Sequence, residues 1–286
     1  MRRAFVVAAA AAVVFVLGAG VAVAREFSLP AAHVEARVLP DGSIRVTEHI
    51  TYSFTGRFRG GFREIPLRDG ELLVDPAVSE DGVSYRPGAP ADIGSEGEPG
   101  TFGTTAVDGG VRILWHYAAA DETRSFTVAY TLTGVAEAWD DVVDVYLQLW
   151  GDEWDVELGR LTGDVTLPRP APGTVRVWGH AAGVDGGTEL REDGRGASVL
   201  AENVPPGQFV EVRLVFPRAL LTSTAGAEVR SGTALDRILA EEAALAAGEA
   251  AARRRARWIR SNVAWLVPLT AVFAFAPAGL VALWVY

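Results

Sequence analysis

The residue with the clearest chemical consequence is Glu48, a carboxylate on the apolar face of a predicted strand. Along residues 43–54, polar side chains occupy the odd positions and apolar ones the even positions, except for the acid at position 48. A buried carboxylate without a partner costs several kcal/mol, so we expect Glu48 to pair with the nearby Arg63. Two interpretations follow: a structural ion pair, or a general acid. The first is favoured because the sequence offers no second carboxylate or nucleophile at a defined spacing.

A second candidate site is a run of arginines around the Gly60–Gly61 pair. Two glycines among arginines predict an exposed, mobile turn that holds an anion or a partner. The alternative is a solvated loop that pairs with the acidic remainder of the chain. The residues concerned are Arg57, Arg59, Arg63 and Arg68.

A third candidate is an acidic stretch over residues 137–157, which contains no basic residue. Carboxylates are the ligands that calcium prefers, but the spacing does not match an EF-hand loop. The stretch therefore predicts either a cation-binding rim or a solvated rim that contacts a partner, through Asp140, Asp141, Asp144, Asp152, Glu153 and Asp155.

Three tryptophans, Trp139, Trp150 and Trp154, lie within the same stretch. Aromatic side chains beside carboxylates are suited to sugars, so binding of an envelope polysaccharide is one interpretation. The other is that the tryptophans fill the core, and it is favoured because large aromatic side chains dominate protein cores.

The composition excludes several kinds of chemistry. The chain has 286 residues, no cysteine and a net charge of -10, and all 26 of its basic residues are arginine. Thiol catalysis, disulfides, cysteine-ligated metals and lysine Schiff bases are therefore excluded. The sequence contains no recognisable catalytic motif, and we predict neither a metal nor a cofactor. Residues 25–223 carry a charge of -14, which disfavours nucleic-acid binding.

The elements that would position these residues lie between two apolar ends. Residues 1–24 begin with an arginine pair and end in Ala22-Val23-Ala24. This pattern predicts a secretory signal, although the long apolar run leaves an uncleaved anchor open.

Residues 263–286 form an uncharged run of 24 residues, long enough for a transmembrane helix. A group of arginines precedes the run, and we expect them to meet lipid headgroups. The positive-inside rule would instead place them in the cytoplasm, so either a basic segment follows this sequence or the topology is inverted. The export signal favours the first alternative. These arginines are Arg253, Arg254, Arg255, Arg257 and Arg260.

The region between the ends is predicted to be all-β. Period-two alternation recurs in segments separated by Gly/Pro turns, for example over residues 34–38, 43–54, 111–117, 126–132, 143–149 and 210–216. Many such strands without helices between them predict an antiparallel β-sandwich over residues 25–223. Residues 86–110 are expected to be a flexible loop. Residues 224–262 are predicted to form a helical stalk, because the stretch 234–260 is alanine-rich and Thr233 is suited to be its N-cap.

Several motifs resemble a bacterial family of predicted membrane proteins, domain of unknown function 2207. They run in order from Asp41-Gly42-Ser43-Ile44-Arg45-Val46-Thr47-Glu48 through Gly60-Gly61-Phe62-Arg63-Glu64-Ile65-Pro66, Phe126-x-Val128-x-Tyr130-x-Leu132-x-Gly134 and Leu149-Trp150-Gly151-Asp152-Glu153-Trp154 to Phe216-Pro217. The resemblance implies an exported β-domain with a membrane segment, and it implies no activity.

The sequence thus predicts a membrane-anchored, extracytoplasmic β-domain that binds or assembles a partner at the bacterial cell envelope. The expected partners are the membrane and either another envelope protein or a wall polysaccharide. An extracytoplasmic carboxylate-dependent hydrolase and an envelope sensor are the alternatives. Whether the protein is an enzyme is left open, and the absence of a catalytic constellation favours a binding role.

Overall fold

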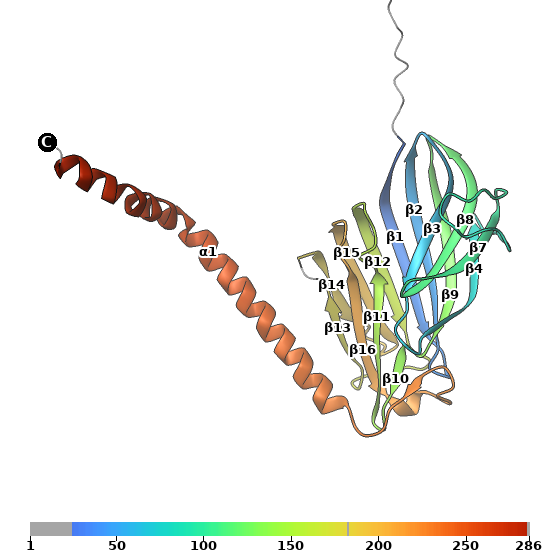
Figure 1. The fold of residues 1–286 in the computed structure, drawn as a ribbon. Helices are drawn as coiled ribbons and strands as arrows, with labels where there is room; N and C mark the ends of the chain where they lie inside the picture. Colours follow the sequence, from blue (N-terminus) through green and yellow to red (C-terminus); the bar gives the residue numbers. More distant parts are fainter. Residues whose placement is uncertain (1–24, 182, 285–286) are drawn as a thin grey trace, which may run out of the picture.

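The computed structural model describes residues 25–181 and 183–284, with the side chains of 263–284 excepted. It consists of a β-domain followed by one long helix that projects away from the domain (Figure 1). The signal segment predicted at residues 1–24 lies outside the described residues.

The β-domain contains three sheets. The largest, called the shared sheet below, has the strand order β14-β15-β12-β1-β2-β9-β4-β5. Its strands are β1 (Glu26–Val38), β2 (Ile44–Thr55), β4 (Leu72–Glu80), β5 (Val83–Ser84), β9 (Thr123–Thr133), β12 (Leu158–Thr166), β14 (Asp185–Leu190) and β15 (Gly196–Val204).

Two smaller sheets complete the domain. The five-stranded sheet has the order β13-β16-β11-β10-β17 and consists of β13 (Arg176–His180), β16 (Val210–Pro217), β11 (Val142–Trp150), β10 (Ala136–Ala138) and β17 (Glu228–Val229). The four-stranded sheet has the order β3-β8-β7-β6 and consists of β3 (Arg57–Pro66), β8 (Gly110–Ala120), β7 (Thr101–Val107) and β6 (Arg86–Pro87). A 3-10 turn, η1 (Arg218–Leu220), follows β16.

Both smaller sheets pack on the shared sheet and lie side by side over it (Figure 1). On one side, the ring of Trp115 from β8 lies 5.6 Å from that of Phe126 on β9. On the other side, Leu149 of β11 packs so closely on Gly163 of β12 that a Cβ there would lie 2.9 Å from the leucine side chain. The domain is therefore two sandwiches that share one sheet, with a seam between the smaller sheets.

The alternation that predicts β2 is confirmed. The even positions from Ile44 to Phe54 are buried and the odd ones are half-buried or exposed, as expected for a strand with one core face. The predicted hairpin is present, since β1 and β2 pair antiparallel with Val38 opposite Ile44. Gly42 in the connecting turn has a φ of +87°, and a Cβ there would lie 2.7 Å from that of Ala227. Only glycine fits this turn without strain.

Two expectations about the β-domain need correction. The sheets are not purely antiparallel, because β1 pairs with β12, β6 with β7 and β10 with β17 in parallel. The predicted loop at 86–110 contains strands β6 and β7, so only residues 88–100 and the turn at 108–109 lie outside strands. Alternation reports which face of a strand is buried but carries no information about the direction of its neighbour.

Helix α1 (Leu235–Trp284) begins later than the predicted stalk. Residues 228–229 still belong to the β-domain as strand β17, and the predicted cap at Thr233 is replaced by Asp141, whose carboxylate accepts the N–H groups of Ala234 and Leu235 at 2.9 and 3.1 Å. The membrane span predicted at 263–286 falls on residues whose side chains lie outside those described. Within the described part of the chain, no helix has both the length and the apolar character needed to cross a membrane.

Candidate functional site

A buried ion pair lies at the seam between the two sandwiches. Arg63 on β3 donates from Nε to Oε2 of Glu48 on β2 at 2.9 Å, and Tyr130 on β9 donates its hydroxyl to Oε1 at 2.6 Å. Glu48 is 1% exposed and Arg63 is 3% exposed. Both carboxylate oxygens are therefore engaged by protein donors, which compensates the loss of water that burial causes.

The electrostatics of this group keep each partner in its bonding form. Burial lowers the pKa of Arg63, but the attraction of the Glu48 carboxylate, its hydrogen bond with Arg63 and the neighbouring tyrosines together outweigh burial and raise this pKa above its usual value. Burial also raises the pKa of the Tyr130 hydroxyl well above its usual value, so this hydroxyl stays a donor. Arg63 remains a cation and Tyr130 remains neutral, as an interior anchor requires.

Arg63 also connects the seam to the segment that follows β11. Its Nη1 contacts the carboxylate of Glu153, and its guanidinium carbon lies 5.7 Å from the centre of the Trp154 ring. Trp154 in turn stacks on Trp150 with ring centres 4.6 Å apart. One arginine therefore joins strands β2 and β3 to the 151–157 segment.

Beside this arginine is a pocket of about 260 Å³, called the seam pocket below. Its wall contains the polar residues Arg63, Glu64, Glu153 and Asp155, and two glycines, Gly60 and Gly61. Aromatic rings make up most of the remaining lining, from Phe27, Tyr52, Phe54, Phe58, Phe62, Tyr117 and Trp154.

Two residues that line the seam pocket each carry a buried polar atom that has no partner within the described protein. The two atoms are the hydroxyl of Tyr52 and Nε1 of Trp154. Tyr52 is 4% exposed, and buried donors are almost always hydrogen-bonded. The alternation along β2 predicts that Tyr52 is buried, but it does not indicate that its hydroxyl is unsatisfied.

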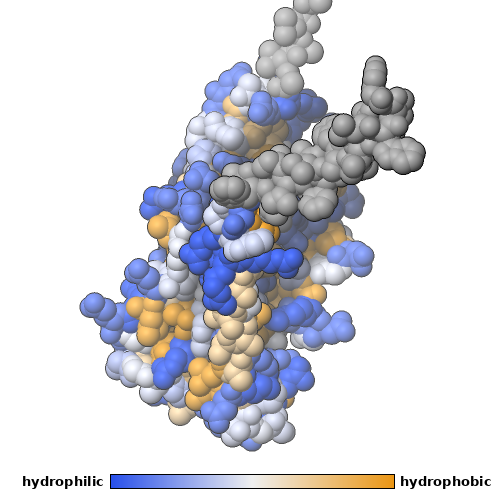
Figure 2. All heavy atoms as spheres, turned by 90° about the vertical axis from the view of Figure 1, so that its left-hand side faces the viewer, coloured by the Kyte–Doolittle hydropathy of each residue, from blue (hydrophilic) through white to orange (hydrophobic). Residues whose placement is uncertain are grey.

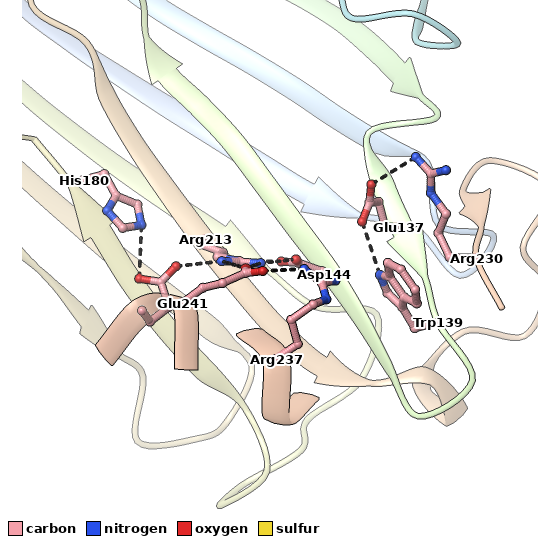
Figure 3. Close-up of polar contacts among 9 residues, drawn as sticks. Glu137, Trp139, Asp144, His180, Arg213, Arg230, Arg237 and Glu241 are labelled. Atoms are coloured by element: carbon pink, nitrogen blue, oxygen red, sulfur yellow. Dashed lines mark hydrogen bonds and ion pairs between the residues drawn. The ribbon is translucent and has the colours of Figure 1, made fainter. Parts of the chain in front are cut away.

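A second buried charge group fastens α1 to the β-domain (Figure 3). Arg213 on β16 binds Asp144 on β11 through two hydrogen bonds, of 3.0 Å from Nε and 2.6 Å from Nη2. Its Nη1 donates to Glu242 of α1 at 2.8 Å, and both Nη atoms reach Glu241 at 3.2–3.3 Å. We call these four residues the joint cluster. Three of them, Arg213, Asp144 and Glu242, are buried.

Neighbouring contacts strengthen the joint cluster. Burial alone lowers the pKa of Arg213, but the hydrogen bonds that it donates to Asp144, Glu242 and Glu241 and the attraction of Asp144 together outweigh burial and raise this pKa above its usual value. Arg237 on α1 donates to Glu241 at 2.6 Å and lies over the ring of Trp139 at 5.0 Å. His180 of β13 lies 3.5 Å from Glu242 and closes the other side of the cluster (Figure 3).

Apolar packing and helix capping act at the same joint. Ala234 and Ile238 are buried against Val142 and Val215 on the outer face of the five-stranded sheet. Asp141 caps the helix, and although burial raises its pKa, the N–H groups of Ala234 and Leu235 outweigh this and lower the pKa overall. The base of α1 is thus held by packing, a cap and buried charges together.

The acids predicted to form one rim are used in separate places. Asp144 belongs to the joint cluster, Asp141 caps α1, and Asp140 accepts the N–H of Gly232 at 2.8 Å. Glu153 contacts Arg63, and Asp155 lines the seam pocket while Asp152 is exposed. Among the described residues, no group of three or more His, Cys, Asp or Glu side chains is arranged to hold a metal ion.

The arginine turn predicted over residues 57–68 is wrong as a local structure. Residues 57–66 form the edge strand β3, in which Gly61 lies against the ring of Trp115, where a Cβ would come within 3.0 Å. The arginines therefore point to different surroundings: Arg63 is buried, Arg59 lies 3.6 Å from Glu96, and Arg68 pairs with Glu71. Arg57 is exposed at the start of the strand.

The arginines that follow in α1 are exposed. Figure 2 views the molecule along the direction in which α1 projects, and shows hydrophilic residues gathered beyond the first, alanine-rich turns. The set consists of Arg253, Arg254, Arg255, Arg257 and Arg260.

Sequence reasoning missed the joint cluster. Arg213 lies within β16, where every side chain from Val210 to Phe216 except that of Glu211 is buried. A buried charge needs a partner. An arginine in such a strand therefore indicates that another element covers the face of the strand that points away from the core. The acid pair Glu241 and Glu242, about two turns into α1, is the matching signal.

Comparison with known proteins identifies the family of this chain. A family model described as "Predicted membrane protein (DUF2207) N-terminal domain" matches residues 28–216, which confirms the resemblance found in the sequence. Comparison with curated proteins finds no match.

Solved structures give only distant likenesses. A Legionella pneumophila protein described as nutrient-binding matches with 11% identity over 66% of this chain and 66% of its own, at a TM-score of 0.39. A Parabacteroides distasonis protein described as a protease matches with 10% identity over 67% and 40%, also at 0.39. An M1 zinc metallopeptidase from Deinococcus radiodurans matches with 9% identity over 68% and 43%, at 0.36. At such scores these likenesses carry no argument about function.

Proposed function

Since this chain belongs to the family of predicted membrane proteins that share the DUF2207 N-terminal domain, we propose that it is a membrane-anchored binding or assembly module of the bacterial cell envelope. Residues 1–24 direct export, the β-domain acts outside the cytoplasm, and residues 263–286 cross the membrane. Residues 224–262 connect the two.

The joint cluster is the observation that carries this proposal. A β-domain on a flexible tether would not need three carboxylates and an arginine to hold the first turns of its helix. The cluster fixes the β-domain in one orientation relative to α1. If α1 is anchored in the membrane, the binding surfaces of the domain therefore also have a fixed orientation relative to the membrane. Residues 235–262 span about 40 Å as a helix, which gives the domain reach from the membrane.

The state of Glu48 supports a binding role over hydrolysis. A carboxylate that acts as a general acid must reach a substrate proton or leaving group. Both oxygens of Glu48 are instead occupied by Arg63 and Tyr130 inside the core. The pair therefore serves to fix β2, β3 and β9 relative to one another.

The absence of cysteine from the sequence makes the proposed orientation directly testable. A single Asp69→Cys substitution places one thiol on an exposed turn of the β-domain. In intact cells we expect a membrane-impermeant maleimide to label this variant as fully as it does in permeabilised cells. Labelling that requires permeabilisation would contradict export of the domain. The cysteine-free natural sequence is the matched control for background labelling.

The assembly role is tested by photocrosslinking from the same kind of variant. Because the chain has no lysine, the reagent is a thiol-linked photocrosslinker attached to Asp155→Cys at the seam pocket. One recurrent envelope component in the crosslinked product is the expected result. Asp69→Cys, which carries the crosslinker on a different surface, is the control. If both variants give the same crosslinked products, a specific binding surface at the seam is contradicted.

A further inference from the structure

We propose that two histidines on the outer face of the shared sheet, His33 on β1 and His49 on β2, form a binding site for a divalent transition metal such as Zn²⁺ or Cu²⁺. This inference goes beyond the proposed function, because it does not depend on where the β-domain acts. The sequence around each histidine contains no metal-binding motif. The pairing of β1 with β2 creates the site.

The register of β1 and β2 brings the two rings together. His33 lies directly opposite His49 in the antiparallel pair, and residues so placed have Cβ atoms about 4.5–5.5 Å apart. The rings are stacked, with centres 6.1 Å apart and planes inclined by 18°. Imidazole nitrogens bind Zn²⁺ at about 2.0–2.1 Å, so small rotations of the two side chains bring both rings to one ion.

The two histidines are accessible from solvent. Both smaller sheets pack on the opposite face of the shared sheet (Figure 1), where the alternate side chains Val34 and Glu48 are buried. His49 is exposed and His33 is half-buried. A hydrated metal ion therefore reaches both rings without any opening of the domain.

Two threonines orient the rings as a metal site requires. Nδ1 of His33 lies 2.8 Å from Oγ1 of Thr162 on β12, and Nδ1 of His49 lies 2.9 Å from Oγ1 of Thr127 on β9. When each Nδ1 donates its proton to the threonine, each Nε2 carries the free lone pair that a metal needs. Outer hydrogen bonds of this kind fix the tautomer and orientation of metal-ligating histidines. The four residues stand on four adjacent strands of the shared sheet.

A carboxylate beside His33 supplies a third ligand. Oε1 of Glu35 lies 3.7 Å from Nε2 of His33, and Oδ2 of Asp164 lies 4.0 Å from the same atom. Asp164 is already bound by Arg191 and Ser198. The exposed side chain of Glu35 has no other ion pair or hydrogen bond with the described residues, so a rotation can bring it to the metal. The site is thus a pair of imidazoles completed by an exposed carboxylate, and not one of the preassembled three-ligand groups that the described residues lack.

The ligand set selects the class of metal. Imidazole nitrogens suit Zn²⁺, Cu²⁺ and Ni²⁺, whereas Ca²⁺ and Mg²⁺ prefer oxygen ligands. Two nitrogens and one carboxylate therefore favour a transition metal over the hard cations. Two imidazoles and one carboxylate leave at least one coordination position of Zn²⁺ open to water.

The decisive variants each remove one imidazole or its orienting hydroxyl. His33→Gln and His49→Gln delete one ligand each on the solvent side of the sheet, and both are expected to stay folded. Thr162→Val deletes the hydroxyl beside His33 and keeps the branched shape. The matched control is Thr51→Val, the same change on the same face, where the hydroxyl bonds that of Ser125 at 2.9 Å.

The experiment titrates Zn²⁺ into the full-length, tag-free protein in detergent and measures the heat of binding. We expect one site in the natural sequence and in Thr51→Val, about 10-fold weaker binding by Thr162→Val, and no measurable binding by either histidine variant. Excess Ca²⁺ should not compete. The electron paramagnetic resonance spectrum of bound Cu²⁺ should show coupling to two imidazole nitrogens.

Three results would overturn the proposal. The first is no Zn²⁺ binding by the folded natural protein, as judged by its melting temperature. The second is equal binding by the natural sequence and both histidine variants, because the metal would then lie on carboxylates elsewhere. The third is loss of binding in only one histidine variant, or a Cu²⁺ spectrum with one nitrogen, since the two rings would then not share an ion.

Discussion

The two buried charge groups of this protein differ in what they connect. The Glu48–Arg63 pair joins strands within the β-domain and is closed by the hydroxyl of Tyr130, while Arg63 also contacts the partly exposed Glu153. The joint cluster joins the β-domain to α1 and gathers three carboxylates around one arginine, with Glu241 at its solvent edge. The first group lies inside the β-domain and fixes its strands, whereas the second holds a helix against the domain. Disruption of the two groups should therefore have different consequences.

The largest expected effect comes from breaking the core anchor. Arg63→Leu leaves Glu48 as an uncompensated buried charge, which typically costs about 3–5 kcal/mol of folding free energy. Denaturant unfolding of the full chain in detergent should show a loss of this size, with the whole β-domain destabilised. The double variant Glu48→Leu/Arg63→Leu should recover much of the loss. A double variant as unstable as the single one would show that the pair is not the source.

A more local effect is expected at the joint. Arg213→Met removes hydrogen bonds to charged groups, each worth about 1.5–3 kcal/mol, and leaves Asp144 and Glu242 unpaired. Hydrogen exchange should rise in the first turns of α1, around residues 235–242, while the strands of the shared sheet keep their protection. Equal loss of protection in both regions would contradict the difference between the two charge groups.

The helix cap predicts a pH dependence. Asp141 has a lowered pKa in the folded protein, so its contribution is complete above the unfolded value of about 3.9 and is lost as pH falls through the lower folded value. Asp141→Ala should cost about 1 kcal/mol at neutral pH. In the natural sequence, protonation of Asp141 at low pH should fray the helix start at Ala234 and Leu235. The variant has no cap to lose, so this part of the acid-induced fraying should be absent from it. Hydrogen exchange at these amides between pH 5 and pH 2 is the measurement. Identical acid profiles for the natural sequence and the variant would contradict this role.

The smallest effect is expected where the charges are exposed. Arg59 and Glu96 lie 3.6 Å apart with side chains 88% and 90% exposed, and such pairs contribute about 0–1 kcal/mol. Arg59→Leu should therefore leave the unfolding free energy within about 0.5 kcal/mol of the natural value. This variant is the control for Arg63→Leu on the same strand. A loss as large as that of Arg63→Leu would show that burial does not decide the outcome.

The sequence predicts the parts of this fold that depend on burial along one strand. The alternation around Glu48 predicts β2, its hairpin with β1 and the burial of the acid itself. It cannot predict the parallel pairing of β1 with β12, because these strands are far apart in the chain and alternation is silent on direction. Residues 57–66 appear as a turn because Gly60 and Gly61 suggest one. They form a strand because Gly61 lies against Trp115 of β8, a contact invisible from local sequence.

The candidate sites show the same limit. The pairing of Glu48 with Arg63 can be predicted from the free energy that an unpaired buried carboxylate would cost. Such a carboxylate needs a cation, and Arg63 is close to it in sequence. The joint cluster joins residues more than ninety positions apart, from Asp144 to Glu242, and only the tertiary fold brings them together. The seam pocket depends on rings from four separate segments, so its aromatic residues look like core residues in the sequence.

The central claim is that the joint cluster holds α1 in one orientation relative to the β-domain, and a distance measurement tests it directly. Spin labels at Glu189→Cys on β14 and Ala246→Cys on α1 can be introduced into a chain that has no other cysteine. In nanodiscs, electron–electron double resonance should give one narrow distance distribution for the natural cluster and a broad one after Arg213→Met. A broad distribution in the protein with the intact cluster would contradict the account.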